Sequence, residues 1–582
     1  MSKIRLLLSV SCLSLYLGAC ASLPGGPTDH LVGAPDPGHA IATASVSPYG
    51  LFLAGQAAGA GGDSSTAADY YAAAARDLPD QGFLQDHAFT AALLSGDVSK
   101  AAALAPAKGQ GDVSIGQLGL LTVAINDMAE DHPRDAEGVL ASADFVPPNR
   151  VAQLLLAPWA AAAAGDWKTA LALPDAKGDR LVAALTQLNQ ALLLERGKRY
   201  ALADAAFRRL LAEGDGEGLI TADYVAFLER RGRRTDAVAL CDASLKGDPT
   251  ARYVRQLRDR AASGAPAPAL LSWNDAAAEA IITPAAIFLA EKQPELGLDY
   301  LSLALRLNPH EDEAWMLVGD TKNAVDDSLG ARAAYLNVTP TSPDYIDARG
   351  RLIATYDQTA DAAKIVDLAQ ETVKNAPNDD GALVLLADAL NGAERYDEAS
   401  KVMDTLMQHL GANAGWDAYF TRGIALDRSG RWPEAEADFR KALALKPDES
   451  DVLNYLGYSW IDSGEKLQEA KAMVEKAVAA KPDSGAMVDS LGWAYYRLGD
   501  FKRAVEQLER ACELEPADPD INNHLGDAYW QAGRRNEAHF QWARVLTLSP
   551  SAKLRAEVQL KLQNGLAADG APAAPPAAIA AR

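Results

Sequence analysis

The sequence predicts an all-α protein, an α-solenoid (superhelix) in which about fourteen helix pairs stack in two blocks. The first observation is a period of about 34 residues at which Gly, Ala and Pro return in the same order. The second is the length of 582 residues, which is too great for one ordinary core. The third is the abundance of Ala, the residue with the highest helix propensity.

The period is clearest over the last four copies. Each copy carries a Gly within a first helix, then an Ala and a large apolar residue in a second helix, then a Pro. Small residues suit close helix crossings and Pro cannot continue a helix, so the pattern fits stacked helix pairs. In turns such as Leu498-Gly499-Asp500, Gly predicts a positive φ that ends the first helix. The positions are Gly423, Ala435, Phe439 and Pro447; Gly457, Ala470, Val474 and Pro482; Gly492, Ala504, Leu508 and Pro516; and Gly526, Ala538, Trp542 and Pro550.

The first residues of the chain predict a secretory signal. Residues 1–19 have a basic start and an apolar run that is shorter than the roughly 20 residues of a membrane span. The ending Leu17-Gly18-Ala19-Cys20 resembles a bacterial lipobox, which implies that Cys20 carries a lipid; an ordinary signal peptide is the alternative. Residues 20–46 are rich in Gly, Pro and Ala and predict a flexible linker.

Two arrays follow the linker. Residues 47–250 predict an N-terminal array of degenerate copies, and residues 278–550 predict a C-terminal array. Between them, residues 251–277 break the phase of the repeat and include the run Ser263-Gly264-Ala265-Pro266. Pro and Gly at this density interrupt helix packing, so a hinge is expected there. A long loop inside one continuous superhelix is the alternative.

The end of the chain predicts a cap and a tail. Residues 551–566 form an expected amphipathic helix that covers the open end of the array. Residues 567–582 are rich in Ala and Pro and are expected to be disordered. The apolar residues of the capping helix that are expected to face partly inward are Leu554, Val558, Leu560 and Leu562.

Charge and composition exclude several classes of function. The net charge is −23, which argues against nucleic acid as a partner. Four Cys residues form no disulfide scaffold and no zinc-site spacing. We find no catalytic constellation, metal site or cofactor motif, so we expect a protein that is not an enzyme. The tract His310-Glu311-Asp312-Glu313 is interpreted as a solvated loop and helix start, and His524 as a structural residue.

The repeat resembles the tetratricopeptide repeat. In that family the first helices line a concave groove, and residues three or four apart share one helix face. Aromatic, Asn and Arg side chains along such a groove suit an extended peptide. A packing role is the alternative for the two Trp residues among them. The groove residues that the resemblance implies are Asn454, Tyr458, Asp489, Trp493, Tyr496, Arg497, Asn523, Asp527 and Trp530.

A narrower resemblance concerns function. The runs Tyr455–Trp460, Asp489–Tyr496 and His524–Trp530 resemble proteobacterial repeat lipoproteins, one of which partners a periplasmic carboxy-terminal processing protease. This implies a scaffold, lipid-anchored on the periplasmic side of the outer membrane, that binds protein or peptide partners such as that protease and cell-wall hydrolases. The alternative is a structural component of an export or outer-membrane assembly complex, including polysaccharide secretion. A hydrolase acting on peptidoglycan is a third hypothesis.

Overall fold

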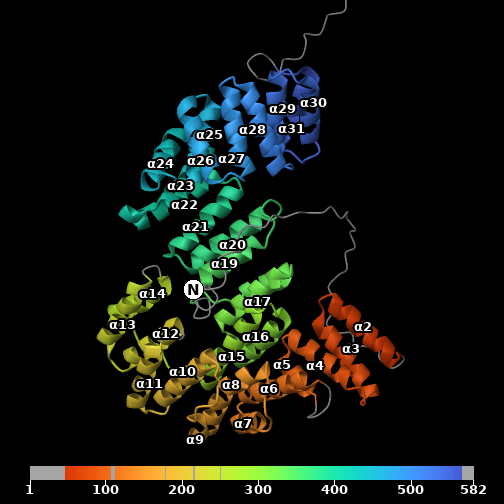
Figure 1. The fold of residues 1–582 in the computed structure, drawn as a ribbon, viewed down its shortest axis with the longest axis vertical. Coiled ribbons are helices and arrows are strands. Elements are labelled where there is room, and N and C mark those ends of the chain that lie inside the picture. Colours follow the sequence, from red (N-terminus) through yellow and green to blue (C-terminus); the bar gives the residue numbers. More distant parts are fainter. Residues whose placement is uncertain (1–45, 107–111, 177, 214–216, 249–250, 567–582) are drawn as a thin grey trace, which may run out of the picture. The chain divides into compact units, whose positions relative to one another are not determined.

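The computed structural model describes residues 46–106, 112–176, 178–213, 217–248 and 251–566 (Figure 1). Within these ranges the chain is all-helical and contains no strand. It forms two compact units, unit 1 (Met1–Tyr356) and unit 2 (Asp357–Arg582). The predicted signal, the lipidated Cys20, most of the linker and the tail lie outside the described residues.

Unit 1 is built from helices that alternate as first and second members of a pair, with two helices outside the pairs, α14 and α19. The helices are α2 (Pro48–Ala60), α3 (Ser64–Asp77), α4 (Gly82–Leu94), α5 (Val98–Ala103), α6 (Val113–Ala129), α7 (Pro133–Ala141), α8 (Asn149–Ala164), α9 (Trp167–Ala170), α10 (Arg180–Arg196), α11 (Tyr200–Glu213), α12 (Glu217–Arg230), α13 (Arg234–Gly247), α14 (Arg252–Ser263), α15 (Trp273–Ala290), α16 (Pro294–Leu307), α17 (Asp312–Ala324), α18 (Ser328–Tyr335) and α19 (Tyr345–Ala354).

Unit 2 continues the alternation and ends with a single helix, α31. Its helices are α20 (Ala362–Asn375), α21 (Asp380–Gly392), α22 (Tyr396–Leu410), η2 (Gly411–Asn413), α23 (Trp416–Arg428), α24 (Trp432–Leu445), α25 (Ser450–Ser463), α26 (Leu467–Ala480), α27 (Gly485–Arg497), α28 (Phe501–Leu514), α29 (Pro519–Gln531), α30 (Arg535–Val545) and α31 (Ala552–Asn564). With α14, α19, α20 and α31 set apart, the described α-helices form thirteen successive packed pairs, which agrees with the predicted solenoid of about fourteen pairs.

The repeat glycines lie where the two helices of a pair cross. A Cβ atom added to Gly492 would lie 2.6 Å from Leu508 Cγ, and one added to Gly526 would lie 2.5 Å from Trp542 Cδ1. Only a residue without a side chain fits such a contact, so the predicted register is confirmed. The same relation joins Gly423 to Phe439, Gly319 to Tyr335 and Gly55 to Tyr71.

Gly also ends first helices, as the turns predict. Gly499 and Gly533, which follow α27 and α29, have φ angles of 79° and 80°. In this region an L side chain is strained, so the two glycines let the chain reverse into the second helix.

Helices α15 and α16 pack back on the N-terminal array. Helix α15 is apolar nearly all round, and it packs against α8 while α16 packs against α6 and α4 (Figure 1). Tyr300 Oη donates a hydrogen bond of 2.7 Å to Asn149 Oδ1 across this contact. One hydrophobic core therefore includes side chains from both predicted arrays. A helix that is apolar nearly all round has no polar face to expose to solvent, so other helices must cover it on all sides.

The region between the predicted arrays, residues 251–277, contains helix α14 and the start of helix α15. Helix α14 occupies the start of this region, and Gly264 ends that helix with φ 76°. Helix α15 begins at Trp273, earlier than expected from the repeat, because Ser272 and Asp275 form a capping box. The compact units divide instead between Tyr356 and Asp357. The hinge over 251–277 and the array boundaries stay predictions.

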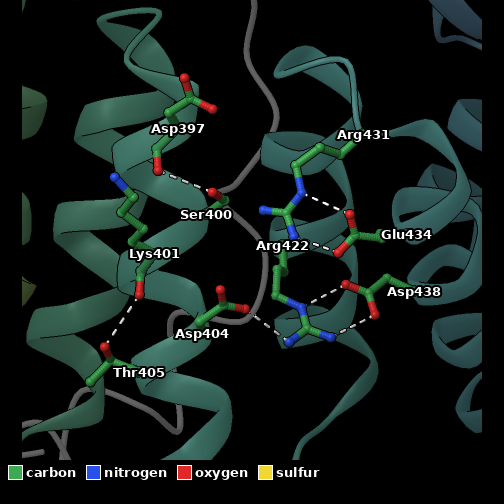
Figure 2. A network of polar contacts seen from close by, with 9 residues as sticks. All are labelled: Asp397, Ser400, Lys401, Asp404, Thr405, Arg422, Arg431, Glu434 and Asp438. Atoms are coloured by element: carbon green, nitrogen blue, oxygen red, sulfur yellow. Dashed lines mark hydrogen bonds and ion pairs between the residues drawn. The ribbon is translucent and has the colours of Figure 1, made fainter.

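In unit 2 a polar network joins helices of neighbouring pairs (Figure 2). Arg422 on α23 donates two hydrogen bonds, of 2.7 and 2.8 Å, to the carboxylate of Asp438 on α24. It donates a third, of 3.2 Å, to Asp404 on α22. Asp438 is buried, so Arg422 both neutralises that carboxylate and links two successive pairs. A planar guanidinium suits this task because it can meet two acceptors at fixed angles.

The capping helix is α31, and its inward face differs in part from the expected one. Leu554 and Val558 are buried, but Leu560 is 43% exposed. The third buried residue of this face is Lys561, because residues three or four apart share a face of the helix. Among the described residues, no helix combines the length and apolarity that crossing a membrane requires.

Candidate functional site

The first helices α25, α27 and α29 pack beside one another and carry all nine predicted groove residues. We call these nine side chains together the first-helix face; Asp489, Tyr496, Asn523 and Asp527 among them are buried. The repeat itself produces this face, because each first helix carries residues at positions equivalent to those of the preceding first helix. Its residues fall into three groups along the array. The first group is Asn454, Tyr458 and Arg497, the middle group is Asp489, Trp493 and Tyr496, and the last group is Asn523, Asp527 and Trp530.

The middle group is a stack of rings held by an ion pair. Trp493 lies between Tyr496 and His524, with ring centroids 4.4 and 4.2 Å away. The Nδ1 of His524 is 2.9 Å from Oδ2 of Asp489, and because a carboxylate can only accept, the ring N–H donates. Both faces of the Trp493 ring are therefore covered by the chain itself. The structural role expected for His524 agrees with this geometry.

Burial and charge act in opposite directions on His524. Burial, the largest single effect, lowers the pKa of His524, but the carboxylates of Asp489 and Asp527 together outweigh it and the pKa is raised. A histidine whose pKa is higher in the folded state stabilises the fold fully below its unfolded value of about 6.5. That stability is lost as the pH rises through the folded pKa.

We therefore expect the stabilising effect of His524 to weaken as the pH increases above about 6.5. The thermal midpoints of the wild type and His524→Gln should differ more at pH 6 than at pH 9, as followed by circular dichroism. Asp489→Asn serves as a control, because it removes the charge that raises the pKa. A difference that stays constant or grows with pH would contradict the assignment.

The last group is covered by α31. Lys561 is almost fully buried, and its Nζ donates to Asn523 Oδ1 at 2.9 Å and to Asp527 Oδ2 at 2.8 Å. Asp527 also accepts a bond of 2.9 Å from Trp542 Nε1. Trp530 Nε1 donates to the Leu566 carbonyl oxygen at 3.3 Å. The predicted groove residues of this pair are thus occupied by the end of the same chain.

Around the first group, two buried polar atoms make no hydrogen bond within the described part of the chain. Asn454 Oδ1 on α25 and Trp493 Nε1 on α27 are buried and have no hydrogen-bond partner among the described residues. Tyr458 lies between these two residues in the sequence and is half-buried. Burial raises the pKa of its hydroxyl group. Arg497 donates a bond of 2.6 Å to the carbonyl oxygen of Asp462. An acceptor and a donor on adjacent helices are therefore the free groups of the face.

Lys561 is not among the residues predicted from the sequence. The signal was present, because position 561 follows Leu554 and Val558 at helical spacing and so shares their buried face. A lysine on an apolar face needs a buried carboxylate as partner, and Asp527 lies among the residues assigned to the groove.

Chemical features of an enzyme or a metal site were also sought. No cluster of three or more His, Cys, Asp or Glu residues in the described ranges is arranged to hold a metal ion. Burial raises the pKa of the Cys241 thiol to about 11 and that of the Cys512 thiol to about 12. A thiol with a raised pKa is a poor nucleophile, so these two residues are packing residues. The absence of catalysis stays a prediction.

The fold defines the chain as an α-solenoid of helix pairs. Residues 271–550 match the family model of the tetratricopeptide repeat, so this part of the chain is similar to that family. Such repeats generally mediate protein–protein interactions, and proteins built from them are generally scaffolds without enzymatic activity. Among curated proteins, no sequence matches the chain.

Several solved structures of helical-repeat proteins are similar to the chain. The Cut9–Hcn1 hetero-tetramer of APC/C is 14% identical, with a TM-score of 0.37 over 90% of this chain and 99% of that chain. A tetratricopeptide repeat protein of Parabacteroides merdae is 12% identical, with a TM-score of 0.37 over 44% and 99%. TTC0263 of Thermus thermophilus is 21% identical, with a TM-score of 0.29 over 32% and 100%. Similarity at these scores says nothing about what the chain binds.

Proposed function

We propose that the protein is a membrane-anchored periplasmic scaffold that binds a segment of an envelope protein along the first-helix face of unit 2. The observation that carries the proposal is the pair of unpartnered groups, Asn454 Oδ1 and Trp493 Nε1. A buried polar group without a partner costs about 1–3 kcal/mol. The backbone N–H and C=O of a bound peptide would satisfy the two groups and recover that free energy.

The position of α31 limits where the partner lies. Asn523, Asp527 and Trp530 already bind the end of the chain, so the partner contacts α25 and α27 rather than α29. The binding surface is therefore shorter than the nine residues expected from the sequence.

The charge of this region favours a basic partner. Burial is the main cause that raises the pKa of Asp520, and the neighbouring carboxylates raise it further. The charge of His524 acts in the opposite direction without reversing the shift. Asp462 is exposed next to Arg497, and the carboxylate of Asp489 pairs with His524. A surface with excess negative charge attracts Lys and Arg side chains and repels a terminal carboxylate. A clamp for a terminal carboxylate is therefore disfavoured.

The cellular setting of the proposal comes from the sequence. The lipobox-like ending at Cys20 supports a lipid anchor, and the linker over 20–46 supports an array that stands off the membrane. The resemblance to repeat lipoproteins supports delivery of substrates to a processing protease at the outer membrane. These features lie outside the described residues and belong to the proposal.

We expect a photo-crosslinking amino acid at position 458 to capture the partner in cells. Position 540 is the matched control, because Phe540 is an aromatic residue of the same array that is 78% exposed on α30 and lies away from the first-helix face. Asn454→Ala and Trp493→Phe should each reduce capture at least about tenfold, since each removes one hydrogen bond and Phe keeps the ring stack.

Mass spectrometry of the captured protein separates the two candidate roles. A soluble protease or a cell-wall hydrolase supports the scaffold, whereas an integral outer-membrane protein favours the assembly complex. Equal capture from positions 458 and 540, or unchanged capture in both variants, would remove the first-helix face from the proposal.

A further inference from the structure

Unit 1 contains a cavity that is separate from the first-helix face. Its volume is about 320 Å³, at the lower end of the range for ligand sites. First helices α8, α10 and α15 form its walls, and the segment before α15 and the start of α17 close it. The cavity exists because α15 returns to α8. Its apolar floor consists of Leu155, Leu185, Leu188, Leu192 and Ile282.

One polar group of the floor has no partner. Trp159 lines the cavity and is 2% exposed, and its indole Nε1–H has no acceptor among the described residues. Buried N–H groups in folded proteins almost always meet an acceptor. The acceptor that is missing here is one that a bound molecule can bring, such as a carbonyl oxygen.

One side of the cavity carries several carboxylates. Glu311, Asp312 and Glu313 at the start of α17 line it together with Glu279 of α15. Burial raises the pKa of Glu311 to about 8, and the charge of Glu279 adds to the effect. Asn308 Nδ2 donates a bond of 3.0 Å to Glu311 Oε2, and no Lys or Arg of the described residues pairs with this carboxylate. A pKa of about 8 leaves Glu311 mostly protonated near pH 7, and a cation bound beside it would lower that pKa and favour the charged carboxylate.

The arginines on the opposite side are already engaged. Arg230 donates bonds of 2.8 and 2.7 Å to the buried carboxylate of Glu195. The guanidinium of Arg196 lies 3.8 Å from the ring centroid of Trp273 and donates to the carbonyl oxygen of Leu271. Both guanidinium groups are engaged within the chain, so neither is available to Glu311.

We propose that the cavity is a second binding site, which takes a peptide segment with a basic side chain between apolar residues. The basic group binds Glu311 beside Glu279, a peptide carbonyl accepts from Trp159 Nε1, and the apolar side chains pack on the leucine floor. This site does not depend on the function proposed for unit 2. The tract His310–Glu313, which the sequence analysis interpreted as solvated, supplies the recognition of charge.

The test is a calorimetric titration of the full chain with three acetylated and amidated tripeptides at low salt. The probes are Leu-Lys-Leu, its analogue with norleucine in place of Lys, and Leu-Glu-Leu. We expect the Lys peptide to bind at least about tenfold more tightly than either other peptide, because only the Lys side chain can form a charge-assisted hydrogen bond with Glu311. Glu311→Gln should reduce the affinity for the Lys peptide about tenfold and leave the norleucine peptide unchanged.

Two further variants separate binding from folding. Glu295→Gln changes an exposed Glu at the start of α16 and should leave all affinities unchanged. Trp159→Phe should weaken all three peptides alike, since each offers the same carbonyl groups. Circular dichroism establishes that each variant is folded before titration.

Four results would overturn the proposal. These are no binding of the Lys peptide to the wild type, equal binding of the three peptides, tighter binding of the Glu peptide, and an unchanged affinity in Glu311→Gln. Butylamine, which mimics the Lys side chain alone, should bind far more weakly than the Lys peptide. Equal binding of butylamine would show that the cavity takes a small amine and not a peptide.

Discussion

Replacing Ala504 with Glu should lower the free energy of unfolding of unit 2 by about 4 kcal/mol or more, the largest effect we expect from any single substitution. Ala504 on α28 is fully buried, in the core that α27 and α28 share with the next pair. At the crossing of these helices Gly492 already lies against Leu508 without room for a Cβ atom. A longer, charged side chain must therefore force the helices apart or stay buried without a partner.

Urea unfolding followed by tryptophan fluorescence measures this loss, and hydrogen exchange of residues 485–514 localises it. The matched control is Ala472→Glu, because Ala472 is exposed on α26, the second helix of the preceding pair. That variant should stay within about 0.5 kcal/mol of the wild type. If Ala504→Glu unfolds at the same urea concentration as the wild type, the assignment of the helix crossing is wrong.

Replacing Lys561 with Met should lower the free energy of unfolding by about 3 kcal/mol and release α31 from the array. Met has a similar length and no charge, so packing is largely kept. Asp527, which is 3% exposed, loses the cation 2.8 Å from its Oδ2. A buried carboxylate without its cation is costly, so the helix that covers it is expected to detach.

A second substitution tests the cause. Asp527→Asn in the Lys561→Met background should recover most of the loss, because Asn carries no charge and still accepts from Trp542 Nε1. Lys553→Met on the exposed side of α31 should have little effect. Hydrogen exchange of residues 552–564 reports the docking of the helix. Loss of stability without rescue in the double variant would show that packing, not charge, holds α31.

The fold could be predicted because the repeat marks its own contacts. Gly423, Gly492 and Gly526 recur under a large residue of the second helix, and the structure places each pair in contact. A clash at a crossing excludes most residue types, so the constraint leaves a signal in a single sequence. The count of helix pairs and their order follow from that signal.

The candidate site could be predicted less well. The nine residues do lie on one face, but hydrogen bonds decide which of them a partner can reach. Asp489 pairs with His524, 35 residues away, and Asp527 pairs with Lys561, 34 residues away. Pairing of this kind depends on the rotation of each helix and on what the chain does after the last repeat. The repeat pattern contains no information about either.

The return of α15 could not be predicted from the repeat for a related reason. A period describes how each pair contacts the next one, whereas α15 contacts α8 and α16 contacts α6. The one available signal is the composition of α15, which is apolar nearly all round. Such a helix must be buried, but its composition does not say against which partner.

This return sets an order for synthesis of the protein. The bond between Tyr300 and Asn149 spans 151 residues, and the core it belongs to is complete only when α16 and the first part of α17 have been made. A ribosome that has released only the first 250 residues therefore displays a half-built interior, with α8 and α6 open to water. Contacts this distant in sequence form late, so the nascent chain is exposed to aggregation during that interval. A truncated version of unit 1 must extend through Leu317 to contain the whole of this core.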